Sequence, residues 1–270
     1  MSEFINTIDV LGDDAVIDGI ISRTITEFKD DVVTNVSAYA FYNCTALTEV
    51  DLPNVTTVGK QAFVNCTALE SVNMPLLTSS SGSQDNMVFA NTAIKQIYFP
   101  LLTSTRANWF ENCKNLVSAD LPSVKSIAMG SFSGCESLVS VNLPEATTVC
   151  GFKDCTSLVY LNAPKCTSLG GGAYSFQRTT SLKRLDFSAL TSVADYGMFY
   201  NSAIEAFISR GDTVPTLGSA NIFDLCPIGN GTGYIYVPRA LVNSYKSATN
   251  WSNYASQIRA IEDYPDITGG

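Results

Sequence analysis

Eight cysteines and a complete lack of histidine limit the chemistry that this chain of 270 residues could perform. Cysteine thiolates bind zinc and form disulfides, so the spacing of the thiols matters first. Thr92, Thr179 and Ser202 stand at one position of a recurring segment that is otherwise filled by Cys44, Cys66, Cys113, Cys135 and Cys155. Because a position shared by Cys, Thr and Ser suits a small, buried, weakly polar side chain, we expect free thiols.

Two other uses of the cysteines stay open. Neighbouring copies of the segment would lie about 4.8 Å apart if they stack as strands, which makes two disulfides conceivable, Cys44 with Cys66 and Cys113 with Cys135. A zinc site at Cys150, Cys155 and Cys166 is less favoured, because Cys166 falls in an aliphatic column and no paired C-x-x-C exists. We predict no metal and no cofactor.

The missing histidine also removes the commonest general base and proton shuttle. The sequence contains no G-x-S-x-G, P-loop or dinucleotide-binding motif. A serine nucleophile would need a lysine base spaced as S-x-x-K, and Ser123-Val124-Lys125 does not have that spacing. We therefore predict that the protein is not an enzyme.

The composition excludes further classes of partner. A net charge of -9 and a pI near 4.5 oppose binding to nucleic acid, which requires clustered Lys and Arg. No apolar run approaches the roughly 20 residues of a membrane span, and Met1–Asn6 lacks the basic start of a signal peptide. We expect no membrane span and no visible leader, and the compartment stays unknown.

A segment that recurs eight times at roughly 22 residues dominates the chain, and such a period is typical of solenoids. Its phenylalanines are Phe41, Phe63, Phe89, Phe110, Phe132, Phe152, Phe176 and Phe199, with a degenerate copy at Phe223. Each copy continues as L-x-x-V-x-L, whose final alternation predicts a short strand in a parallel stack. Proline ends that strand in six copies, because it cannot donate to a ladder: Pro53, Pro75, Pro100, Pro122, Pro144 and Pro164. The pieces that follow are too short for a full helix.

The phrase A-F-x-N-C-T-x-L-x-x-V-x-L-P, intact at Ala40–Pro53 and Ala62–Pro75, resembles BspA-type bacterial leucine-rich repeat proteins over about residues 25–238. The resemblance implies a right-handed leucine-rich repeat solenoid with a parallel β-sheet on one face, a mostly irregular or short-strand convex side, and helical caps. It also implies an adhesion role at the cell surface or after secretion. Similar proteins without leaders occur among phage-encoded proteins.

We expect three parts in the chain. They are an N-terminal cap over residues 1–39, an array of about eight repeats over 40–210, and a degenerate repeat with a C-terminal helical cap over 211–270. In the caps, apolar spacing predicts a helix around Val16–Ile21 and another from Leu241 to Ile258. Insertions at Thr78–Asn86 and Gly170–Gly172 interrupt the period and could line a binding rim.

The outward residues of the strands form the candidate ligand-binding surface. In the two predicted ladders the candidates are Glu49, Gln96, Tyr160 and Arg184, and Asp51, Asn73, Tyr98, Asp120, Asn142, Asn162 and Asp186. Both ladders also continue to Ala206 and Ile208, which we expect to be exposed. Short polar side chains could simply bond along the stack, or they could surround Tyr98 and Tyr160 as aromatic anchors.

We therefore predict a non-enzymatic scaffold for recognition or adhesion that binds a protein or a glycan through this surface. The alternative is a structural or assembly component of a cell envelope or phage particle with no small ligand. An open strand surface would favour the first, and symmetric burial of that surface would favour the second.

Overall fold

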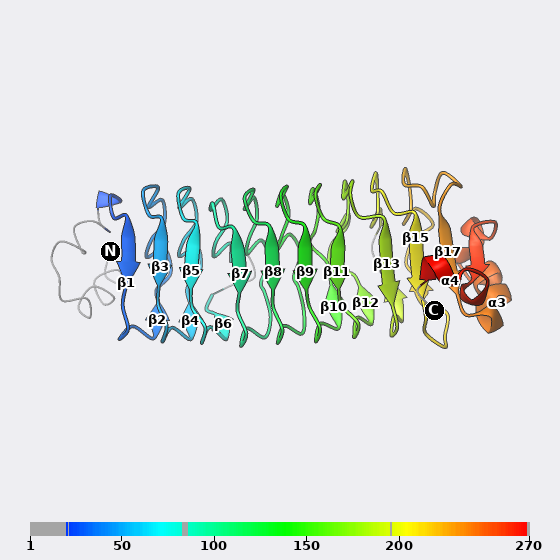
Figure 1. The fold of residues 1–270 in the computed structure, drawn as a ribbon, viewed down its shortest axis with the longest axis horizontal. Helices are drawn as coiled ribbons and strands as arrows, with labels where there is room; N and C mark the ends of the chain where they lie inside the picture. Colours follow the sequence, from blue (N-terminus) through cyan, green and yellow to red (C-terminus); the bar gives the residue numbers. More distant parts are fainter. Residues whose placement is uncertain (1–19, 21, 83–85, 195, 269–270) are drawn as a thin grey trace.

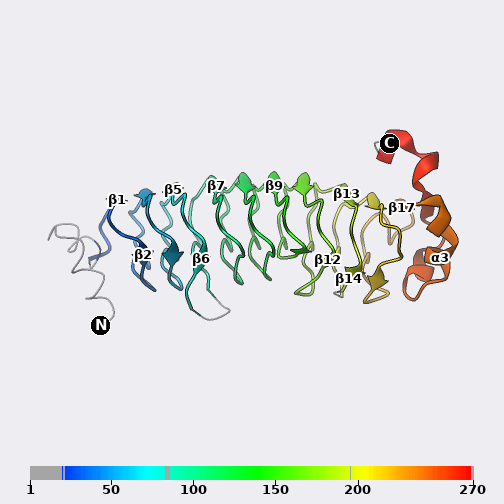
Figure 2. The ribbon, with the colours of Figure 1, turned by 90° about the horizontal axis from the view of Figure 1, so that it is seen from below.

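The computed structural model describes residues 20, 22–82, 86–194 and 196–268. Figure 1 shows an extended stack of coils in which the chain advances by one coil per repeat. Figure 2 shows longer strands on one side of the stack and short strands on the other, and the array runs almost straight. This is the predicted parallel β-solenoid. The predicted helix around Val16–Ile21 lies outside the described residues, apart from the buried Ile20.

The longer strands form the first side of the stack, and all their pairings are parallel. Val50 pairs with Phe28 on one side and with Val72 on the other, so the predicted register is confirmed. The strands are β1 Glu27–Lys29, β3 Glu49–Asp51, β5 Ser71–Asn73, β7 Gln96–Tyr98, β8 Ser118–Asp120, β9 Ser140–Asn142, β11 Tyr160–Asn162, β13 Arg184–Phe187, β15 Ala206–Ser209 and β17 Tyr234–Val237.

The opposite side consists of two-residue strands joined by turns, as the repeat length predicts. Isolated bridges from Ser126 to Ser104 and to Thr148 continue the stack where no strand is assigned in the described part of the chain. The short strands are β2 Asn35–Val36, β4 Thr57–Val58, β6 Ser79–Ser80, β10 Thr148–Val149, β12 Ser168–Leu169, β14 Ser192–Val193 and β16 Thr216–Leu217.

The core is a set of columns in which like residues stack on like. Most phenylalanine rings of the column stack on the next coil, with centroids 5.0 Å apart for Phe41 and Phe63, whereas Phe176 and Phe199 are tilted by 34°. The eight cysteines, all among the described residues, are buried, as the column predicted, and they form no disulfide. The thiol of Cys66 donates to the Phe41 carbonyl at 3.0 Å, and burial raises the pKa of Cys113 to about 11. These thiols are therefore structural.

The turn before each longer strand depends on a left-handed residue. Asn43, Asn65 and Asn91 have φ of 61°, 60° and 59°, and Gly134 fills the same place with φ of 73°. Asparagine and glycine tolerate this region better than other residues. The amides also bond along the stack, since Nδ2 of Asn65 donates to Oδ1 of Asn43 at 2.9 Å. These asparagines therefore have a structural use.

The C-terminal cap differs from the continuous helix that the spacing predicted. Five short helices and one strand follow β17 in the described residues: η1 Arg239–Leu241, α3 Val242–Ser247, η2 Trp251–Tyr254, β18 Ile258–Ala260, η3 Ile261–Asp263 and α4 Pro265–Thr268. The helical path stops at Ala248, which is extended, and Asn250 is left-handed with φ of 66°. Ile258 belongs to a strand that pairs with β17, so the prediction of a helix there was wrong.

The longer strands divide into three sheets, in the orders β1-β3-β5, β7-β8-β9-β11 and β13-β15-β17-β18. Among the described residues, β5 is not paired with β7, and β11 is not paired with β13. Both breaks follow the repeats that contain the insertions at Thr78–Asn86 and Gly170–Gly172. The longer coils separate the strands, and the central residues Val72 and Leu161 are only partly buried at these two places.

Candidate functional site: the strand face and its cleft

We call the outward side of the longer strands, from β1 to β17, the strand face. On it, Tyr98 and Tyr160 are 60% and 58% exposed. They lie on β7 and β11, the outer strands of one four-stranded sheet, so three strand spacings separate them. Across the strands this is about 14 Å, and Tyr160 is also offset by two residues along the strand, since Asn162 shares the row of Tyr98. On the two strands between them, Ser118 and Ser140 have small side chains that project little from the sheet.

The Asp and Asn side chains of the second ladder bond to one another along the stack. In three pairs an amide Nδ2 donates to an oxygen of the preceding coil: Asn73 to Asp51 at 2.8 Å, Asn142 to Asp120 at 2.8 Å and Asn162 to Asn142 at 2.7 Å. Tyr98 interrupts this row between Asn73 and Asp120. These amides and carboxylates therefore support the stack, and the tyrosines contribute the large exposed side chains.

The first ladder is more varied. Glu49 on β3 forms an ion pair with Lys29 at 3.1 Å. Gln96 lies exposed on β7 and pairs in register with Ser118 of β8. Arg184 occupies the same column on β13. The ladders thus place all the predicted candidates on one face, but Glu49 lies in a different sheet from Tyr160 and is not brought near it.

The prediction that both ladders stay exposed to their ends was wrong. Ala206 and Ile208 are buried with Tyr236 in a small apolar cluster, against which Ile261 and Tyr264 pack. The chain turns back after β18, and Figures 1 and 2 show α4 on the outer side of the strands beside β17. The C-terminal segment, residues 261–268, therefore covers the last part of the strand face.

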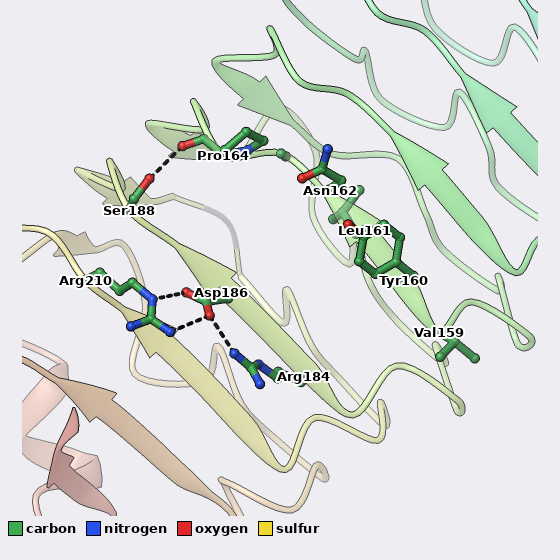
Figure 3. Close-up of a pocket in the computed structure, with 10 residues that line it drawn as sticks. Val159, Tyr160, Leu161, Asn162, Pro164, Arg184, Asp186, Ser188 and Arg210 are labelled. Carbon is green, nitrogen blue, oxygen red and sulfur yellow. Dashed lines mark hydrogen bonds and ion pairs between the residues drawn. The ribbon is translucent and has the colours of Figure 1, made fainter. Parts of the chain in front are cut away.

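A cleft of about 540 Å³ opens where β11 and β13 fail to pair. Figure 3 shows Tyr160 and Asn162 on its β11 side and Arg184 and Asp186 on its β13 side. Leu161, which is only partly buried, also lines the cleft. The cleft therefore combines apolar surface with several polar groups, which is usual for binding sites.

A network of two guanidinium groups and one carboxylate forms the polar side of the cleft. Arg210 donates to Asp186 through Nε at 2.7 Å and through Nη2 at 2.9 Å, and Nη2 of Arg184 donates to Oδ2 of Asp186 at 2.8 Å. Burial acts to raise the pKa of Asp186, but the hydrogen bonds from Arg210 and Arg184 outweigh it and hold the pKa below its usual value. Asp186 is therefore ionised at neutral pH.

Two polar side chains of the cleft, Ser188 and Arg210, were not among the predicted candidates, and neither were its apolar lining residues. Each stands directly after its strand, at the position that proline occupies in six other repeats. A proline there would offer no side-chain donor, whereas Arg210 binds Asp186 and Ser188 donates to the Pro164 carbonyl at 2.8 Å. The loss of proline in these two repeats was the sequence signal that could have identified them.

Neither a metal site nor a membrane span is evident in the described residues. Within the described ranges, His, Cys, Asp and Glu form no cluster of three or more that could hold a metal ion. In the same part of the chain, every helix is too short or too polar to cross a bilayer.

The parallel stack with one coil per repeat defines a solenoid repeat protein. The BspA type leucine rich repeat region matches residues 18–117 and 103–228, in 6 copies. These matches cover most of the chain, so the protein belongs to this family. The family resemblance drawn from the repeat phrase is confirmed. No curated protein sequence matches the chain.

The chain is also similar to solved structures. A leucine-rich repeat protein from Bacteroides ovatus is 21% identical and superimposes with a TM-score of 0.65 over 80% of this chain and 56% of that protein. A leucine-rich repeat protein from T. pallidum is 28% identical, with a TM-score of 0.48, over 56% of this chain and 72% of that protein. The chain thus spans little more than half of the Bacteroides protein's length. The first likeness shows the solenoid fold alone.

Proposed function

We propose that this protein is a non-enzymatic recognition scaffold that binds a macromolecular partner across the strand face, from Tyr98 to the cleft. The single observation behind the proposal is that two highly exposed tyrosines lie on the outer strands of one four-stranded sheet. Tyrosine supplies a large contact area at little cost in side-chain entropy and is enriched among residues that dominate binding energy.

The surroundings of these tyrosines support the same proposal. The amide ladders hold the sheet in one geometry, because each side chain bonds to the next coil. A rigid surface loses little entropy when a partner binds. The cleft beside Tyr160 adds Arg184 and Asp186, which are themselves fixed by mutual bonds. The family consists of repeat scaffolds, and this role uses the scaffold without any catalytic group.

A comparison of variants on printed arrays tests the proposal. Wild type, the double variant Tyr98→Ala/Tyr160→Ala and the control Tyr196→Ala are applied to a glycan array and to an array of protein-derived peptides. Tyr196 is 49% exposed in the turn segment between β14 and β15, away from the strand face. We expect the double variant to lose more than tenfold in affinity for the spots that wild type binds, and the control to retain them.

Equal binding by wild type and the double variant would contradict the proposal. Light scattering on the same samples then addresses the alternative role. A closed or filamentous assembly of wild type that buries the strand face would favour a structural component.

A further inference from the structure

A row of three exposed valines follows the strand face beside the first ladder. Val117, Val139 and Val159 immediately precede β8, β9 and β11, and they are 42%, 41% and 58% exposed. Their backbones are in register, since Val139 N donates to Val117 O at 2.8 Å and Val159 N donates to Val139 O at 2.9 Å. We call these three residues the valine row. A contiguous exposed apolar strip of this kind points to an interaction site.

The row ends in the cleft, and cations flank it. Val159 lines the cleft together with Tyr160 and Leu161, which extends the apolar surface. In the same column, the coil before the row has Lys95 and the coil after it has Lys183. Lys95 pairs with Glu70, and Lys183 pairs with Glu205, so each lysine stands between the valines and its glutamate. The charged groups closest to the row within its column are therefore positive, although the chain as a whole is acidic.

The part of the strand face next to the cleft, from β13 to β17, binds the protein's own C-terminal segment. The C-terminal segment crosses the strands from β17 towards β13: the Tyr264 ring meets that of Tyr236 at 5.4 Å, and the Ile267 carbonyl accepts from Nη1 of Arg184 at 2.7 Å. Ile261 and Tyr264 pack on the apolar cluster of Ala206 and Ile208.

The composition of that segment is specific. Its apolar residues recur at every third position, Ile261, Tyr264 and Ile267, and acidic residues occupy three of the positions between them. Two of these acids bind the same residue: Asp263 forms an ion pair with Nη2 of Arg239, and Glu262 accepts a hydrogen bond from the Arg239 backbone N–H. Arg184 thus touches the occupied surface on one side and lines the open cleft on the other.

We propose that the valine row and the cleft bind a partner polypeptide segment of the same chemistry, with aliphatic or aromatic side chains flanked by carboxylates. This inference rests on the proposed function and narrows its partner to a protein. The segment would cross β8, β9 and β11 with its apolar side chains on the valines and its carboxylates near Lys95 and Lys183. Three strand spacings, about 14 Å, separate the coil of Lys95 from β11, and the break between β11 and β13 adds more than one further spacing before Lys183. A segment that reaches both lysines therefore needs at least about six extended residues.

A displayed library of random 12-residue peptides tests the inference. The library is selected on wild type, and the enriched peptides are synthesised and titrated against three proteins: wild type, Val117→Thr/Val139→Thr/Val159→Thr, and Leu76→Asn/Leu101→Asn. Threonine keeps the β-branched shape, and the three positions are exposed, so the valine variant should remain folded. Leu76 and Leu101 are 40% and 44% exposed but follow β5 and β7, so the control removes apolar surface elsewhere.

We expect peptides rich in apolar and acidic residues, a more than tenfold loss of affinity in the valine variant, and less than threefold in the leucine control. Enriched peptides without that composition, or equal losses in both variants, would overturn the inference. Neutral oligosaccharides such as cellohexaose and mannohexaose are titrated in parallel, and tight binding that the valine variant weakens would reassign the site to a glycan. Partner binding that depends on Tyr98 and Tyr160 but not on the valines would leave the proposed function intact and refute this inference alone.

Discussion

Arg210 donates two hydrogen bonds to Asp186 from the neighbouring coil, Nε to Oδ1 at 2.7 Å and Nη2 to Oδ2 at 2.9 Å. Through this pair, the chain that leaves β15 is tied to β13 on the polar side of the cleft. Hydrogen bonds to ionised groups are the stronger ones in proteins. The pair therefore holds β13 and β15 together next to the break between β11 and β13, where the cleft lies.

The first prediction concerns the pH dependence of this pair. Asp186→Asn should lower the free energy of unfolding at pH 7 by about 1 to 3 kcal/mol, because charge-assisted bonds are lost. The folded-state pKa of Asp186 lies below its unfolded value, so its contribution is fully present above about pH 5 and declines as the pH falls through the lowered pKa. Urea unfolding of both proteins from pH 3 to pH 8 checks this. A difference that grows in acid would contradict it.

The second prediction tests the core columns. Leu138 is fully buried in the middle of the array, and its neighbour Val139 is 41% exposed. Leu138→Ala should cost about 2 to 5 kcal/mol, because a cavity forms in the stack. Val139→Ala should cost under about 1 kcal/mol. Denaturant midpoints measure both, and similar values for the two variants would show that the columns are misplaced.

The third prediction concerns the left-handed turn. Asn65 has φ of 60°, so Asn65→Ala should be less stable than Asn65→Gly by about 1 kcal/mol. Both variants lose the amide bonds to Asn43 and Asn91, so their difference isolates the backbone conformation. Thermal or denaturant unfolding of the two variants provides the measurement. Equal stability would mean that this turn does not impose the left-handed conformation.

The fourth prediction concerns the thiols. Burial raises the pKa of Cys113 to about 11 and of Cys166 to about 12, and a protonated thiol is a poor nucleophile. The native protein should react slowly with a small alkylating reagent at pH 7, and the denatured, unreduced protein should give close to eight thiols. Four or fewer after denaturation would indicate disulfides and an oxidising compartment.

The fold was predictable because each repeat has the same pattern of apolar and polar residues. When the copies are aligned, the residue types shared at one position show whether that position is buried. Val50 and Val72 in the strand, and Cys44 and Cys66 in the turn, are examples. Proline, which lacks a backbone N–H, recurs at one aligned position and so marked the strand ends. Local rules and long-range stacking agree in a solenoid, since each coil contacts only its neighbours.

The candidate site was predictable only in part. The outward ladders followed from period two, so Tyr98 and Tyr160 were found, but the break between β11 and β13 depends on how the chain accommodates Gly170–Gly172. Likewise, burial of Ala206 and Ile208 arises from a segment that returns after β18. Contacts between residues distant in sequence and outside the repeat have no periodic signature, which explains why this burial was missed. Arg210 had a weaker signal, the loss of proline at one position of the repeat.

Site-specific photocrosslinking tests the central claim most directly. A benzophenone amino acid is placed at Ser140, in the middle of the strand face, or at Thr147, which is exposed beside β10 on the opposite side. Each protein is irradiated with a peptide or glycan selected by wild type, and the adducts are measured by mass spectrometry. We predict crosslinks from Ser140 that disappear with Tyr98→Ala/Tyr160→Ala, and none from Thr147. Equal crosslinking from both positions, or crosslinking from Thr147 alone, would contradict recognition through the strand face.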